Sequence, residues 1–177
     1  EDILAASRDL IKENGWAAVS IRAVASRCSV SAGTIYNYYE SKADLLSDTI
    51  ESIWHEIFFH PEDEQIFHDV ESCISWIYER LEYGNRQFPG FFSLHSFGFM
   101  RDEKTSGKKR MMKTWGHILN GLCEVLGNDP KVRADVFDQE FTEKKFADIL
   151  FSLILVSMIR QDYDPSSVLM LVKKTLY

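Results

Sequence analysis

The stretch SIRAVASRCSVSAGTIYNYYESKADLL, residues 20–46, decides the fold of the first part of this 177-residue chain. Ser20 is placed to cap a short helix, because Ser is among the preferred N-cap residues. Ser31 is placed to cap a second short helix over residues 32–38, and Ser41 opens a longer third helix. Two short helices joined by a tight polar turn are the layout of a helix-turn-helix motif.

The second short helix carries residue types that suit contact with DNA. Its first backbone N–H groups, at Ala32 and Gly33, lie at a helix N-terminus, where the dipole favours a phosphate. Gly33 also leaves room for the close approach of a DNA backbone. Polar and aromatic side chains that can reach base edges, thymine methyls or phosphate oxygens follow at Ser31, Thr34, Tyr36, Asn37, Tyr38 and Lys42.

The charge of this region differs from that of the whole chain. The chain has 20 Lys and Arg against 27 Asp and Glu, a net charge of −7, which by itself argues against a nucleic-acid partner. Residues 20–42 hold three cations and one carboxylate, a local charge of +2. We therefore expect DNA binding that depends on dimerisation and falls with salt. Spacing alone fits a plain three-helix bundle with surface tyrosines equally well.

The same residues resemble the DNA-binding domain of TetR (tetracycline repressor) family transcriptional regulators. The shared pattern is V-S-x-G-T-I-Y-N-Y-Y-x-S-K-x-D-L-L, preceded by S-I-R-x-V-A. The resemblance implies one ligand pocket in the body and a homodimer whose last two helices pair with the partner's in a four-helix bundle. It implies DNA contacts at Ser20, Arg22, Ser31, Thr34, Tyr36, Asn37, Tyr38 and Lys42. Gly33 would permit close phosphate approach, and Ala32 stands where many members carry Lys.

Helical spacing of apolar residues recurs through the rest of the chain and predicts an all-α protein of about nine helices. We expect a helix-turn-helix domain over residues 1–46 and a ligand-binding and dimerisation domain over residues 47–177. The helices expected after residue 60 cover residues 64–83, 91–100, 109–126, 142–161 and 165–176, with a basic loop over residues 101–109.

The resemblance implies a ligand pocket in the body, where all twelve Phe lie after residue 50. The aromatic and Met residues over 91–100 and 111–119 would suit a flat apolar ligand there. Ordinary core packing is the alternative explanation for each aromatic residue. The candidate ligand-binding residues are Trp76, Phe92, His95, Phe99 and Trp115.

A dimer face is predicted where one helix is apolar almost all round, over residues 149–159. Such a helix has to be buried on every side, by its own core and by a second subunit. A central core helix in a monomer is the alternative. The candidate interface residues are Leu153, Leu155, Val156, Ile159, Leu169 and Val172.

The composition indicates a cytoplasmic protein. Its three Cys lie far apart without a CxxC pair, which argues against a disulfide framework or zinc ribbon. The first residues lack the pattern of a signal peptide. The apolar stretch over residues 149–159 is shorter than the roughly 20 residues that span a membrane.

Competing sites carry weaker patterns. His60, Glu64 and His68 are spaced for one helical face, but Pro61 places His60 outside the helix, so we expect no metal site and no cofactor. Residues 101–113 carry a local charge of +4 and offer an alternative nucleic-acid surface, although solvated loops are often charged. The sequence contains no GxSxG, P-loop, dinucleotide fingerprint or HExxH motif, so we expect no enzyme activity.

Together these patterns predict a ligand-responsive transcriptional repressor. It would bind a near-palindromic double-stranded DNA operator as a homodimer and be released by a small apolar or aromatic effector. The alternative is a helical ligand-binding or protein-interaction protein that does not bind an operator.

Overall fold

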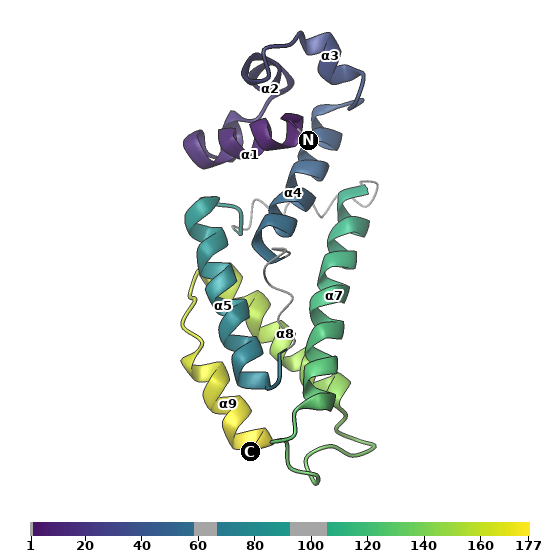
Figure 1. Ribbon diagram of the computed structural model, residues 1–177, viewed down its shortest axis with the longest axis vertical. Helices are drawn as coiled ribbons and strands as arrows, with labels where there is room; N and C mark the ends of the chain where they lie inside the picture. The colour runs from purple at the N-terminus through teal and green to yellow at the C-terminus, as the bar shows by residue number, and fades with distance from the viewer. Residues whose placement is uncertain (1, 59–66, 93–105) are drawn as a thin grey trace. The chain divides into compact units, whose positions relative to one another are not determined.

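The computed structural model describes residues 2–58, 67–92 and 106–177. Within these ranges it describes the side chains of all residues except residue 2 and residues 106–114. The regular elements in this part of the chain are all helical (Figure 1), which confirms the predicted all-α class. They are eight α-helices and a 3₁₀ helix: α1 (Asp2–Asn14), η1 (Trp16–Ala18), α2 (Ile21–Arg27), α3 (Ala32–Tyr36), α4 (Lys42–Phe58), α5 (Val70–Gln87), α7 (Ser106–Asn128), α8 (Glu143–Arg160) and α9 (Ser166–Leu176). None of these described helices is long and apolar enough to cross a membrane.

The chain divides into two compact units. The head unit comprises Glu1–His60 and Tyr83–Met112, and the body unit comprises Pro61–Glu82 and Lys113–Tyr177. The boundary expected after residue 46 falls inside α4, a continuous helix. The body unit contains α8 and α9, and α5 and α7 contribute residues to both units.

The head unit is built on α1, which packs against α2 and α4, while α2 packs against α3. The apolar side chains of these helices form one core, in which Ile11, Val24, Ile35, Leu45 and Ile53 are fully buried. Burying a side chain of this size stabilises a fold by about 1.5–3 kcal/mol. The core therefore fixes the two short helices on the longer α1 and α4.

Charged side chains join α1 to α4 beside this core. The carboxylate of Glu56 pairs with Arg8 at 3.0 Å and with Lys12 at 2.7 Å. The Arg8 guanidinium also donates a hydrogen bond to Ser52. Partly exposed ion pairs of this kind contribute about 1 kcal/mol or less each, so they orient α1 more than they stabilise it.

Aromatic residues around Trp54 form a second cluster in the head unit. The Trp54 ring centroid lies 5.3 Å from that of Phe91, 5.6 Å from Phe92 and 5.7 Å from Phe58. Trp16 in η1 lies 6.1 Å from Phe91. The residues that follow α5 are thus part of the same core as η1 and α4.

The body unit is organised around α8, which contacts both of its long neighbours. The hydroxyls of Tyr78 in α5 and Ser157 in α8 lie 2.8 Å apart, and the rings of Trp115 in α7 and Phe151 in α8 lie 5.7 Å apart. The inner face of α8 is buried at Phe146, Ala147, Leu150, Ile154 and Met158. This face is therefore part of the core of the body unit.

Asp129 ties together the start of α5 and the end of α9. Its carboxylate is almost fully buried and accepts hydrogen bonds from the Val70 N–H at 2.9 Å and the Tyr177 hydroxyl at 2.5 Å. The Lys131 N–H adds a third at 2.9 Å. A buried carboxylate needs such partners to offset its lost hydration, so this loop is fixed in place.

Some helix boundaries differ from the predicted ones. The helix predicted from residue 64 begins at Val70, because Asp69 is its cap and accepts the Ser72 N–H at 2.8 Å. Residues 106–109, expected in a loop, belong to α7, whose first turns contain good helix formers. Of the segment expected over residues 91–100, only residues 91 and 92 are described, and they lie in a turn.

The contact between α5 and α4 gives a test of this packing. A Cβ added to Gly84 would lie 2.6 Å from Ile57 Cδ1 and 3.0 Å from Phe92 Cζ, both buried. We expect Gly84→Ala to lower the free energy of unfolding by about 1–3 kcal/mol. Urea denaturation measures the change.

The control is Gly121→Ala in α7, where an added Cβ meets nothing within 4 Å. It should raise stability by up to about 1 kcal/mol, the helix propensity of Ala over Gly. A Gly84→Ala protein as stable as the Gly121→Ala protein would contradict the close approach of α4 and α5.

Candidate nucleic-acid interface

The turn between α2 and α3 sets the direction of α3. Ser29 has a left-handed backbone, with φ of 56°. The Val30 N–H donates to the Ala25 carbonyl at 2.9 Å, and the Ser29 N–H donates to the Ser26 carbonyl at 3.1 Å. This is the hydrogen-bond pattern of a Schellman motif, in which Gly is the usual left-handed residue.

Side-chain caps fix the starts of the head helices, as predicted. The Ser20 hydroxyl oxygen accepts the Ala23 N–H at 3.1 Å, and the Ser31 hydroxyl oxygen accepts the Thr34 N–H at 3.1 Å. The Ser31 and Thr34 hydroxyls also lie 3.0 Å apart. Each cap contributes about 1 kcal/mol, which matters for a helix as short as α3.

The side chains of α3 and of the turn after it differ strongly in solvent exposure. Ile35 is fully buried, whereas Tyr36 and Tyr38 are 55% and 71% exposed. Asn37 is also exposed. The helix ends at Tyr36, two residues earlier than predicted, because the Tyr38 and Tyr39 N–H groups both donate to the Ile35 carbonyl.

The remaining predicted DNA-binding residues lie on the same elements. Among them Arg22, Ser31, Gly33 and Lys42 are exposed, while Ser20, Ala32 and Thr34 are half-buried. The structure therefore gathers the predicted set on α2, α3 and the start of α4. At that start the Ser41 hydroxyl accepts the Asp44 N–H at 3.2 Å and donates to the Asp44 carboxylate at 2.8 Å.

Arg27 is not available to bind a DNA phosphate, because it is paired with a carboxylate of its own chain. Its guanidinium donates two hydrogen bonds to the Glu13 carboxylate of α1, one of them 2.6 Å long. These bonds lower the pKa of Glu13, so the pair stays charged and balanced. The sequence gives no sign of this pairing, since the partners are 14 positions apart on different helices. The positive charge that residues 20–42 can offer to DNA is therefore smaller than their composition predicts.

The predicted ligand-binding residues lie in different surroundings. Phe92 is 1% exposed in the aromatic core of the head unit. Trp76 and Trp115 belong to the body unit, where they pack on Phe67 and Phe151. His95 and Phe99 lie outside the described residues, so the ligand site stays a prediction.

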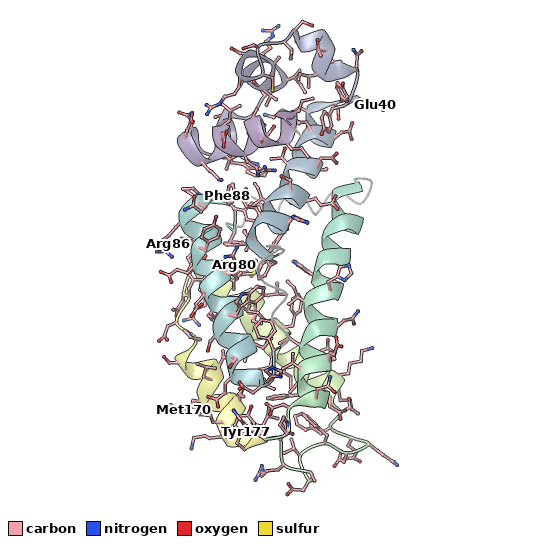
Figure 2. The ribbon with its side chains drawn as sticks, viewed as in Figure 1. Glu40, Arg80, Arg86, Phe88, Met170 and Tyr177 are labelled. Carbon is pink, nitrogen blue, oxygen red and sulfur yellow. The ribbon has the colours of Figure 1, made fainter. Side chains whose placement is uncertain are left out.

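Among the predicted dimer residues, Val172 is the most deeply buried. Val172 is fully buried in the core of its own chain and offers no side chain to a partner. Val156 and Ile159 are 45% and 47% exposed, and Leu153, Leu155 and Leu169 are half-buried. Ile149, at the start of the predicted apolar stretch, and Leu171 are exposed as well, and so is Met170, which the sequence reasoning did not single out. Met170 is labelled on α9 in Figure 2.

The metal alternative gains no support in the described part of the chain. No group of three or more His, Cys, Asp or Glu side chains there is placed to hold a metal ion. His68 is exposed just before α5, and its proposed partners His60 and Glu64 lie outside the described residues.

Residues 3–49 match the family model of bacterial regulatory proteins of the tetR family. The HTH-type transcriptional regulator UidR of Escherichia coli (strain K12) is 38% identical over 48 residues. That alignment covers 27% of this chain and 24% of UidR, so the chain matches about a quarter of the length of this relative.

Solved structures of regulators share the whole fold. The transcriptional regulator FadR from Bacillus subtilis, in complex with stearoyl-CoA, matches with a TM-score of 0.67 and 18% identity over 99% of this chain and 98% of FadR. GusR of Salmonella enterica matches with a TM-score of 0.62 and 19% identity, over 98% and 93% of the two chains. These similarities extend the shared architecture beyond the N-terminal segment.

The left-handed turn at Ser29 can be tested by its energetic cost. We expect Ser29→Gly to raise the free energy of unfolding by about 0.5–1 kcal/mol, because Gly adopts this conformation without a Cβ clash. Ser26→Gly, an exposed position inside α2, should lower it by about the same amount. Thermal denaturation distinguishes the two variants. A stability loss in both would show that Ser29 is not left-handed in solution.

Proposed function

We propose that this chain, whose residues 3–49 match the family model of tetR regulatory proteins, is a ligand-responsive transcriptional repressor that binds DNA as a homodimer. The proposal depends mainly on one observation, that α3 buries a single side chain while polar and aromatic side chains beside it are exposed. Its one buried residue, Ile35, holds the helix in the head, and its polar and aromatic side chains, Tyr36 and Asn37 among them, face outward.

The contacts expected on DNA follow from this arrangement. The N-terminus of α3, with the exposed Gly33, suits a phosphate, and Arg22 and Lys42 supply charge beside it. Tyr36, Asn37 and Tyr38 then face the base edges of the major groove. Two heads would read half-sites about 34–36 Å apart, which requires a near-palindromic operator.

Exposed apolar side chains on α8 and α9 support the homodimer. Ile149, Val156 and Ile159 follow a helical stripe along α8, and each is at least 44% exposed. Met170 and Leu171 are exposed apolar side chains on α9. Large apolar side chains gathered on one surface mark an interaction site, and a second copy of these helices would cover them.

A small apolar effector is the proposed signal. The complex of the B. subtilis regulator FadR with stearoyl-CoA supports this class of ligand, because that protein shares the architecture of this chain. An effector releases DNA only by its differential affinity for a conformation in which the two heads no longer fit successive grooves. The regulators that match the chain support a binding role and not an enzyme activity.

The alternative is a ligand-binding or interaction protein without an operator. It is favoured by the small number of available cations over residues 20–42, where Arg27 is paired with Glu13 and Ala32 supplies no amine. Selection of bound sequences from random duplex DNA decides between the two. The proposal predicts an enriched near-palindrome, and its absence at low salt would overturn it.

Gly33 allows DNA contact to be separated from folding. A Cβ at this position would meet only the Ser31 hydroxyl oxygen, at 3.5 Å, an ordinary contact. We expect Gly33→Ala to keep or raise stability, yet to weaken binding of the selected duplex about tenfold or more, because the new methyl group meets the DNA backbone.

Gly121→Ala is the matched control, since it makes the same change in a helix of the body unit. Fluorescence anisotropy with the labelled duplex measures both variants. If Gly33→Ala binds as tightly as Gly121→Ala, the start of α3 does not approach DNA closely.

Charge placed on the apolar stripe tests the dimer. Ile159→Glu and Val156→Glu would bury a carboxylate between subunits, so both should yield monomers in sedimentation. Ala134→Glu adds the same charge on an exposed loop and should leave the dimer intact. Dimers in both α8 variants would place the interface elsewhere.

A further inference from the structure

We propose that Glu40 sets the level of sequence-independent DNA binding by repelling the phosphate backbone. This role rests on the proposed DNA-binding function and adds a regulatory property to it. Glu40 lies between α3 and α4 (Figure 2) and is exposed. No hydrogen bond or ion pair joins its carboxylate to any residue in the part of the chain that the structure describes, so its charge is not balanced by the fold.

Its neighbours in the chain place Glu40 close to bound DNA. Tyr38 and Lys42, two positions before and after it, are both exposed, while the intervening Tyr39 and Ser41 are half-buried. Consecutive Cα atoms are about 3.8 Å apart, so the Glu40 Cα lies within about 7.6 Å of those of Tyr38 and Lys42. The Glu40 carboxylate is therefore carried on the same short segment of chain as the amine that is proposed to contact a phosphate.

The Glu40 carboxylate has a large effect on sequence-independent DNA binding, because the predicted DNA-contacting residues include few cations. Glu13 balances Arg27, and the exposed cations of the predicted contact set are then Arg22 and Lys42. One unbalanced carboxylate offsets half of that charge. Sequence-independent binding arises almost entirely from cations that neutralise phosphates, so it falls directly when this charge is offset.

Weak sequence-independent binding serves a ligand-controlled repressor. An effector that disturbs head spacing removes the fit to two successive grooves, but it leaves the attraction between each head and the phosphates. The remaining affinity then determines whether the protein leaves DNA. Glu40 keeps this sequence-independent affinity low. The effector-bound protein then leaves the operator completely, and the free protein is not held on non-operator DNA.

A structural role for Glu40 predicts a different result. The residue precedes Ser41, the cap of α4, and a carboxylate near a helix N-terminus stabilises the helix. Loss of that interaction lowers the melting temperature without changing how binding depends on salt. The salt dependence of DNA binding therefore separates the two roles.

The test compares the full-length protein with its Glu40→Gln and Glu124→Gln variants. Glu124 is exposed on α7 in the body unit, so both variants change the net charge equally. Affinity for a random-sequence duplex is measured by anisotropy between 0.05 and 0.2 M salt, the range over which phosphate contacts show clearly. We expect Glu40→Gln to bind about threefold more tightly per head, as one charge removed at about 6 Å in water implies.

The slope of log affinity against log salt should steepen by up to about one per head in Glu40→Gln and stay unchanged in Glu124→Gln. Equal affinities and slopes in the two variants would overturn the inference. So would a changed base preference in Glu40→Gln with no gain on random duplex, since Glu40 would then read a base. Failure of the proposed function looks different: no near-palindrome is enriched, whether or not Glu40→Gln gains affinity for random duplex.

Discussion

The burial of Ile35 is the contact on which the candidate interface depends. A five-residue helix such as α3 has no stability of its own, because helix nucleation is costly and only a few hydrogen bonds repay it. Ile35, fully buried in the head core, anchors the helix from its middle. The Ser31 cap and the left-handed turn at Ser29 fix its start. The outward face is then free to consist of residues that contribute nothing to folding.

The continuous helix α5 has residues in both units of the chain. α5 starts in the body unit, where Asp129 holds its first turn, and its last residues belong to the head unit. There Gly84 allows α5 to approach Ile57 of α4.

The sequence was most informative about features that depend on residues close together in the chain. The caps at Ser20, Ser31 and Ser41 depend on hydrogen bonds within three residues, and all of them are present. The motif over residues 20–46 also predicted the match of residues 3–49 to the tetR family model. Features formed between distant residues could not be seen: the Arg27–Glu13 pair, the Asp129 contact to α5 across 59 positions, and the burial of Val172 in its own core. The left-handed Ser29 carried no signal, because glycine is the residue that marks such turns.

Hydrogen–deuterium exchange with and without the selected duplex tests the central claim most directly, since it reports on every backbone amide without a mutation. The proposed interface predicts slower exchange over residues 20–42 when DNA is bound, and little change over residues 101–113, the most basic stretch of the chain. Protection confined to residues 101–113, with residues 31–42 unaffected, would show that DNA binds through charge at another site and would contradict the account.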